Sequence, residues 1–132
     1  MPGSVHEILH IAPRVAWEAA KQAGVYAGDT LASEAFIHCS ALTEVMSVAD
    51  ARFQGRTDLI VLVIDARRVG PEVRWEEADG QVFPHIYGPL NLDAVFKVLA
   101  LEPGPDGRFA FPDQVIEEQR DGRFVAEEEG QL

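Results

Sequence analysis

The chain has 132 residues, of which 22 are acidic and 11 basic, and its formal net charge is −11. A domain of this length buries roughly two-thirds of its unfolded surface, so neither a disulfide nor a metal is needed to complete a core. The acidic surface disfavours nucleic acid and anionic membranes as partners, because both repel negative charge.

The single cysteine, Cys39, excludes an intrachain disulfide. The N-terminus lacks the basic start and apolar run of a signal peptide, and the longest apolar run, residues 59–64, is far shorter than the roughly 20 residues of a membrane-spanning helix. We therefore expect a cytoplasmic protein of bacterial type, without membrane contact. A local basic patch still leaves a nucleic-acid partner open; its members are Arg52, Arg56, Arg67, Arg68 and Arg74.

Two helices are predicted in the first half of the chain. Residues 13–23 begin with a proline, which suits the first helical position, and Gly24 suits the position just past the end. Residues 41–53 carry apolar side chains at helical spacing, with Ser40 as the predicted N-cap. A strand over residues 36–39 precedes this second helix.

Strands dominate the second half. Residues 58–65 contain the β-branched run of a strand buried on both faces. Residues 72–76 are a further strand, and the Asp79-Gly80 pair predicts a hairpin turn into the strand that carries His85. Residues 94–101 are predicted to be the last strand. This order predicts an α+β fold with two N-terminal helices and a mostly antiparallel sheet.

The composition changes at Glu102. Residues 1–101 form the predicted domain, and residues 102–132 form an acidic extension with nine acidic residues and three arginines. We expect a short helix at residues 112–120 and a mobile end beyond it.

Three of the four histidines lie in apolar runs that are typical of strands: His10, His38 and His85. A buried imidazole needs a hydrogen-bond partner or a ligand to offset its desolvation, so three of them indicate one shared polar site. Because strand side chains alternate between two faces, His38 shares a face with Phe36 and Ser40, and His85 shares one with Phe83 and Tyr87. The alternative is that each histidine is structural and bonds to a backbone carbonyl.

Other chemistry is less well supported. The histidines lack the short spacing of metal ligands, so we assign no metal residues, although a metal-dependent hydrolase stays an alternative. His38 and Cys39 are adjacent and face opposite ways, which argues against a thiol nucleophile.

Two further polar residues are candidates for the site. Glu76 is a candidate general base or stabiliser of positive charge, beside the aromatic Trp75. Asn91 follows a Gly-Pro turn, where it binds ligand or holds the loop.

Several motifs together resemble the bacterial family known as domain of unknown function 952. They are His10 with the following Ala-Pro and Trp17, residues 31–40 (LASEAFIHCS), residues 73–76 (VRWE) and residues 83–94 (FPHIYGPLNLDA). The resemblance covers about residues 7–101.

The resemblance implies an ADP-ribosyltransferase-like fold, a split and mostly antiparallel sheet whose cleft holds NAD in the enzymes. By that resemblance His10 looks like the histidine that bonds an adenosine-side ribose hydroxyl. Ser40 and His38 look like residues on the nicotinamide side, and His85 or Tyr87 would lie on the third motif strand. Transferases of this fold usually have a glutamate on that strand, whereas here Glu76 is on the preceding one.

The functional hypothesis is therefore a protein that holds a nucleotide-type ligand, such as NAD or ADP-ribose, in a histidine-lined cleft and that transfers a group in its catalytic version. In that version His38 or His85 carries the proton, Glu76 stabilises positive charge, and the ligand-binding residues are His10, Ser40, Trp75, Tyr87 and Asn91. The alternative from a different class is a non-catalytic interaction module with structural histidines. The sequence does not indicate an oligomeric state.

Overall fold

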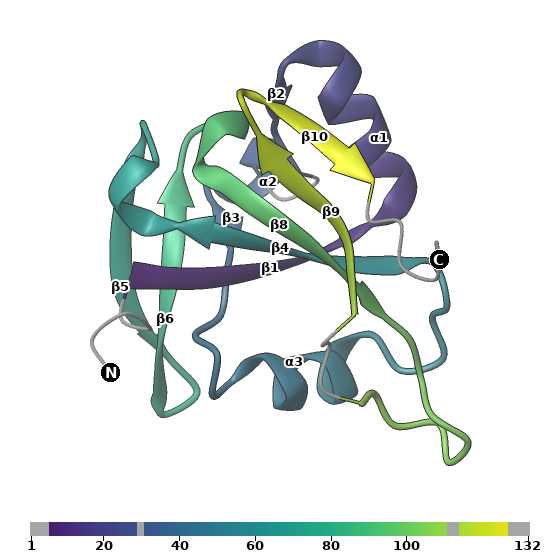
Figure 1. The fold of residues 1–132 in the computed structure, drawn as a ribbon. Helices are drawn as coiled ribbons and strands as arrows, with labels where there is room; N and C mark the ends of the chain where they lie inside the picture. The colour runs from purple at the N-terminus through teal and green to yellow at the C-terminus, as the bar shows by residue number, and fades with distance from the viewer. Residues whose placement is uncertain (1–5, 29–30, 111–113, 127–132) are drawn as a thin grey trace.

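The computed structural model describes residues 6–28, 31–110 and 114–126. Its largest element is a five-stranded antiparallel sheet in the order β1-β4-β8-β9-β10 (Figure 1). The strands of this sheet are β1 (Glu7–Pro13), β4 (Leu59–Asp65), β8 (Val95–Leu101), β9 (Val115–Arg120) and β10 (Arg123–Ala126).

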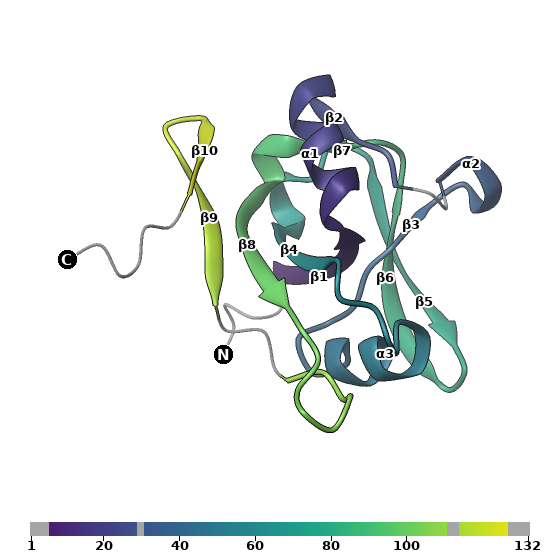
Figure 2. The same ribbon diagram turned by 90° about the vertical axis from the view of Figure 1, so that its right-hand side faces the viewer.

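A second, three-stranded antiparallel sheet has the order β3-β6-β5. It lies on the opposite side of the fold from the β9–β10 hairpin (Figure 2). Its strands are β3 (Ile37–His38), β6 (Gln81–Tyr87) and β5 (Glu72–Ala78), and a separate two-stranded pair joins β2 (Val25–Tyr26) to β7 (Leu90–Asn91). The expected α+β fold with a mostly antiparallel sheet is confirmed.

The first helix, α1 (Arg14–Ala23), forms where the sequence predicts it. Pro13 has extended backbone and caps the helix, and Gly24 ends it with a φ of +87°, a conformation that glycine adopts without strain. The other helices are α2 (Leu31–Glu34) and α3 (Val45–Arg52), with short 3₁₀ turns at Ala66–Arg68 and Leu92–Ala94.

The second predicted helix starts later than expected, and Ser40 is not its N-cap. The backbone N–H of Ser40 donates to the carbonyl of Leu9 over 2.7 Å, and its carbonyl accepts from Leu9 N–H over 2.8 Å. These bonds keep Ser40 in a β-bridge, so the chain needs a turn over residues 42–44 before α3 begins at Val45. The helix is therefore eight residues long instead of thirteen.

The prediction of a helix at residues 112–120 is also wrong, because residues 115–120 are strand β9. This strand pairs with β8 and turns through Asp121 and Gly122 into β10. Residues 94–101 are thus not the last strand of the fold. Residues 127–132, for which a mobile end was expected, lie outside the described residues.

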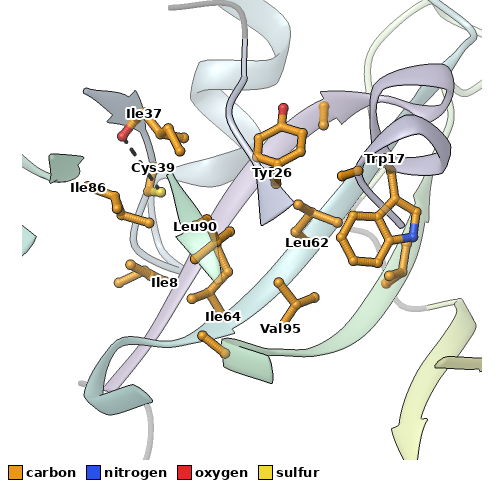
Figure 3. Packing of buried hydrophobic residues seen from close by; sticks show 14 of the residues in the cluster. Ile8, Trp17, Tyr26, Ile37, Cys39, Leu62, Ile64, Ile86, Leu90 and Val95 are labelled. Atoms are coloured by element: carbon orange, nitrogen blue, oxygen red, sulfur yellow. Dashed lines mark hydrogen bonds between the residues drawn. The ribbon is translucent and has the colours of Figure 1, made fainter. Parts of the chain in front are cut away.

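The core is divided by β4, which is buried on both faces as predicted. Its even-numbered residues pack with Ile8, Trp17 and Ile86 in a cluster between the sheets (Figure 3). Its odd-numbered residues pack with Leu9, Val45 and Leu101 in a second cluster beside α3. Because side chains alternate between the two faces of β4, this one strand contributes to both hydrophobic clusters.

Among the described residues, none of the helices has the length and the apolar character that crossing a membrane requires.

Candidate functional site

Two histidines face each other across the β3–β6 ladder. His38 pairs with His85 in the register, and Ile37 pairs with Ile86. Both isoleucines are fully buried in the core, so the alternating histidines lie on the other face of the three-stranded sheet. The imidazole centroids are 5.2 Å apart in an edge-to-face arrangement.

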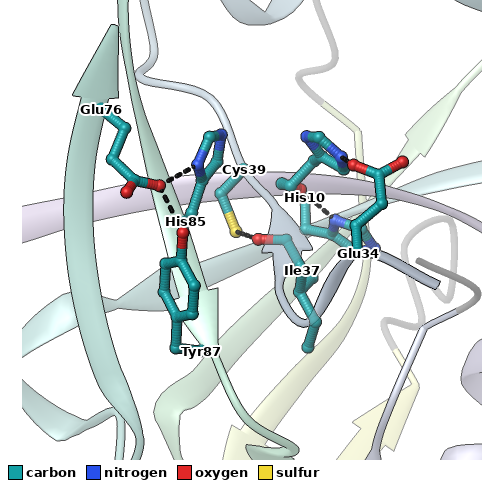
Figure 4. Close-up of polar contacts among 8 residues, drawn as sticks. His10, Glu34, Ile37, Cys39, Glu76, His85 and Tyr87 are labelled. Carbon is teal, nitrogen blue, oxygen red and sulfur yellow. Dashed lines mark hydrogen bonds and ion pairs between the residues drawn. The ribbon is translucent and has the colours of Figure 1, made fainter. Parts of the chain in front are cut away.

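A carboxylate from the neighbouring strand β5 joins this face. Glu76 pairs with Phe83 in the register and therefore points to the same side as His85 and Tyr87. Its Oε1 accepts a hydrogen bond from Nδ1 of His85 and another from the hydroxyl of Tyr87, each over 2.7 Å (Figure 4). These bonds, that from His85 above all, hold the pKa of Glu76 below its usual range.

A second carboxylate accompanies the second histidine. Glu34 is the last residue of α2, and its Oε1 accepts a hydrogen bond from Nε2 of His38 over 2.8 Å. The two side chains are 49% and 41% exposed, whereas the side chain of His85 is 8% exposed. The site therefore contains two imidazole–carboxylate pairs. In one the imidazole is enclosed and the carboxylate of Glu76 is 36% exposed, and in the other both side chains are open to water.

An aromatic ring covers the enclosed imidazole of His85. Phe36 stacks on His85 with a centroid distance of 4.2 Å and also contacts the rings of His38 and Tyr87 at 4.7 and 5.1 Å. The residues of this arrangement are called the histidine cluster below: Glu34, Phe36, His38, Glu76, His85 and Tyr87.

Arg74 borders the cluster with its charge already engaged. Its guanidinium lies 4.2 Å from the ring centroid of Tyr87 and forms an ion pair with Glu72 over 3.1 Å.

Tyr87 stays protonated in the cluster. The hydrogen bond that its hydroxyl donates to Glu76 raises the pKa of that hydroxyl, which keeps the phenol able to donate. With both histidines neutral, the face has more negative than positive charge.

His10 lies in the core next to the cluster and takes part through the backbone. Its Nδ1 donates to the carbonyl of His38 over 2.5 Å, and its Nε2 accepts from the hydroxyl of Tyr26 over 2.8 Å. Both side chains are buried. His10 therefore ties β1 to β3 and supports the strand that carries His38.

Three other predicted site residues lie away from the cluster. Ser40 is buried in its bridge with Leu9. Trp75 lies between Arg74 and Glu76 on β5, so it faces the opposite side of the hairpin, where it is 49% exposed.

The third, Asn91, fastens a loop. Its side chain accepts from the N–H of Gly70 over 2.7 Å and donates to the carbonyl of Arg68 over 2.9 Å and to Asp93 over 2.5 Å. This is the loop-holding alternative considered for Asn91.

The sequence-based prediction did not assign Glu34 or Arg74 to the site. It named Arg74 only as a member of the basic patch, and Phe36 only as a face neighbour of His38. A signal existed for Glu34, because it stands four residues before His38. A similar signal existed for Arg74, because it shares the parity of Glu76 on one strand.

In the described part of the chain, no group of three metal-ligating side chains is arranged to hold an ion. The arginine patch is partly neutralised, since Arg56 pairs with Asp58 and Arg67 pairs with Asp65. A cavity of about 280 Å³ lies beside the β9–β10 hairpin and includes none of the predicted site residues; it is lined by Lys21, Leu92, Asp93, Gln119, Gly122, Arg123 and Phe124.

Comparison with known proteins places the chain in a family. The model of the family described as "Protein of unknown function (DUF952)" matches residues 11–98. No curated protein matches the chain significantly.

The crystal structure of protein CC0527 from Caulobacter crescentus is 31% identical, covering 79% of this chain and 93% of that one, with a TM-score of 0.73. The solution structure of the same protein is also 31% identical, covering 78% and 90% of the two chains, with a TM-score of 0.68. On the family match and these likenesses together, the chain belongs to the DUF952 family of proteins of unknown function.

Proposed function

We propose that this protein binds a nucleotide-type ligand, such as NAD or ADP-ribose, at the histidine cluster and transfers a group from or to it. The single observation that carries the proposal is the His38–His85 cross-strand pair, in which each imidazole is hydrogen-bonded to a carboxylate. Imidazoles held by carboxylates are the usual proton carriers of enzymes near neutral pH. We place this activity in the cytoplasm, as the sequence predicts.

We further propose that the fold is of the ADP-ribosyltransferase-like type. The division of the strands into a five-stranded and a three-stranded sheet supports this assignment. The resemblance calls for a glutamate on the third motif strand, where this chain has His85 and Tyr87. Glu76 reaches both of these side chains from β5, so a carboxylate is present on the same face although it comes from the neighbouring strand.

The chemistry we infer follows from the charges of the cluster. Glu34 and Glu76 each bond to one of the two imidazoles, and Glu72 pairs with Arg74, the cation that lies over the ring of Tyr87. Such a face favours a group that develops positive charge during reaction and disfavours a phosphate in direct contact. We therefore place the sugar side of a nucleotide against the cluster, with its phosphates directed away.

The test is a binding experiment on the intact chain. Adding NAD, ADP-ribose or a 2′-phosphorylated nucleotide should raise the melting temperature and shift the NMR signals of His38 and His85. The His85→Gln variant should lose most of this response, whereas His6→Gln, a histidine outside the cluster, should keep it. If none of the three compounds changes the melting temperature or the histidine signals, the proposal is wrong.

A non-catalytic module is the second candidate, and the packing of His85 favours it. This side chain is 8% exposed and stacks on Phe36, so it contributes to the structure whatever its chemistry. Under this alternative His38→Gln and His85→Gln lower the melting temperature of the protein, and neither the wild type nor the variants respond to the added nucleotides. Retained folding with lost ligand binding would instead support the binding site.

A further inference from the structure

The two nitrogens of His85 have different surroundings. Nδ1 is 2.7 Å from Oε1 of Glu76. In the described part of the chain no group forms a hydrogen bond with Nε2 of His85. Every fully buried side-chain nitrogen or oxygen atom of the described residues has a hydrogen-bond partner. Because Nε2 of His85 has none, this atom is not fully buried and is accessible to solvent, although the side chain as a whole is only 8% exposed.

The identity of the partner fixes the position of the proton on the ring. A carboxylate only accepts hydrogen bonds, so Nδ1 must carry the hydrogen and the neutral ring must have its lone pair on Nε2. The hydroxyl of Tyr87 donates to the same Oε1 and holds the carboxylate in place. Phe36, stacked on the imidazole, prevents the ring from turning over freely.

Neither of the other strand histidines combines these properties. Both nitrogens of His10 are occupied, one by the carbonyl of His38 and the other by Tyr26. His38 bonds to Glu34, but both side chains are more than 40% exposed and are therefore less constrained. His85 is the one imidazole of the three that is enclosed, oriented and open at one nitrogen.

We propose that Nε2 of His85 accepts the proton of a hydroxyl group in the ligand or acceptor, with Glu76 and Tyr87 as positioning residues. This deepens the proposed function and rests on it, because it requires a ligand at the histidine cluster. A hydroxyl fits an exposed lone pair among carboxylates, whereas the oxygens of a nucleotide pyrophosphate have no hydrogen to donate at neutral pH. Any phosphate, inorganic phosphate included, is also repelled by the carboxylates of Glu34 and Glu76.

In the transfer step, the hydroxyl proton moves to Nε2 while the hydroxyl oxygen forms a bond to the electrophilic carbon of the transferred group. The bond from that carbon to its leaving group breaks, and the leaving group takes the electron pair. Glu76 stabilises the imidazolium through Nδ1–H, as a carboxylate behind a catalytic histidine does.

The first test reads the proton position directly from nitrogen chemical shifts of the histidine rings in the free, full-length protein at neutral pH. We expect His85 to be protonated at Nδ1 and unprotonated at Nε2. Glu76→Gln should move this ring toward a mixture of the two tautomers, because an amide both donates and accepts. Glu77→Gln, on the opposite face of β5, is the matched control and should leave it unchanged. Finding wild-type His85 protonated at Nε2 would overturn the proposal.

The second test adds probes to the same samples. ADP-ribose, which carries hydroxyls, should shift the Nε2 signal of His85, and inorganic phosphate should not. Tyr87→Phe should weaken ADP-ribose binding by up to about tenfold, the size of one hydrogen bond. Tyr26→Phe should change His10 and leave His85 unaffected. A shift of Nε2 with phosphate but not with ADP-ribose contradicts the inference. A lack of response to ADP-ribose, NAD and a 2′-phosphorylated nucleotide contradicts the proposed function and the inference with it. Binding of ADP-ribose to a protein whose His85 is protonated at Nε2 contradicts the inference alone.

Discussion

Nε1 of Trp17 donates a hydrogen bond to Oε1 of Glu117 over 3.0 Å, although 100 positions separate the two residues in the chain. The other carboxylate oxygen accepts from Lys21 over 2.7 Å. Phe124 of β10 completes the contact, with its ring edge-on to Trp17 at a centroid distance of 5.0 Å. These contacts fasten the β9–β10 hairpin, which lies beyond the residues matched by the family model, to α1.

Replacing Glu117 by alanine should therefore destabilise the whole domain. The buried indole N–H of Trp17 loses its acceptor, and an unpaired buried donor costs roughly 1–3 kcal/mol. Glu118→Ala on the same strand removes an exposed ion pair with Arg120 and should cost about 0–1 kcal/mol. Urea denaturation of the two variants checks the difference. Equal losses would show that the hairpin is not held through Glu117.

His10→Leu should also lower stability, for a reason unrelated to ligand binding. The substitution removes the donor to the carbonyl of His38 and the acceptor of the Tyr26 hydroxyl. We expect a loss of about 2 kcal/mol or more in the free energy of unfolding, compared with about 1 kcal/mol for Tyr26→Phe. A double-mutant cycle on these residues measures their coupling. A neutral effect of His10→Leu would refute the supporting role of this histidine.

The thiol of Cys39 should be unreactive in the folded protein. It is 4% exposed, and burial raises its pKa far above the ordinary range, so almost no thiolate forms at neutral pH. A thiol reagent such as Ellman's reagent should react at the rate of global unfolding and should modify the single cysteine rapidly in urea. Fast modification under native conditions would contradict the packing described for this residue.

Stability should fall with acid in a way that depends on Glu76. The folded-state pKa of this group is lowered by the hydrogen bonds from His85 and Tyr87. Its contribution is therefore present above the unfolded pKa, which is near 4.5, and is lost as the pH falls through the lower folded pKa. Urea midpoints measured from roughly pH 6 to pH 3 should decline less steeply in Glu76→Gln than in the wild type. Glu77→Gln, the control, should follow the wild-type curve.

Gly88→Ala should be destabilising for two reasons: the backbone conformation of Gly88 is unfavourable for a residue with a side chain, and Pro71 occupies the space that a Cβ would need. Gly88 has a φ of +156°, and a Cβ placed there would lie 2.9 Å from Cβ of Pro71. Strain of this kind costs on the order of 1–3 kcal/mol. Gly104→Ala is a suitable control, because its nearest contact would be 3.4 Å and its φ is not positive. Thermal unfolding of both variants provides the comparison.

Much of the fold could be predicted where local signals and tertiary packing agree. The β-branched run of β4 could be placed from its residues alone, and the Asp79-Gly80 turn identified the β5–β6 hairpin, with both turn residues at positive φ. Alternation also placed His38, His85 and Tyr87 on one face, where the structure brings them together.

The remaining elements depend on partners that are distant in the chain. Residues 115–120 have no strong strand pattern of their own and become a strand by pairing with β8. Ser40 has the chemistry of a helix cap, but its backbone is taken by Leu9. Trp75 is predicted as a site residue because it is next to Glu76 in the sequence. Neighbouring residues of a strand face opposite ways, so the two side chains lie on different faces of β5.

The hairpin that follows the family domain also changes what the large sheet offers to other molecules. Without it, the seven-residue, mostly apolar strand β8 would present an open row of N–H and C=O groups, which is the template on which chains aggregate edge to edge. With β9 and β10 added, the outermost described strand on that side is four residues long and begins with Arg123. Residues 115–126 thus cover an edge of the large sheet that would otherwise be open to pairing with another chain.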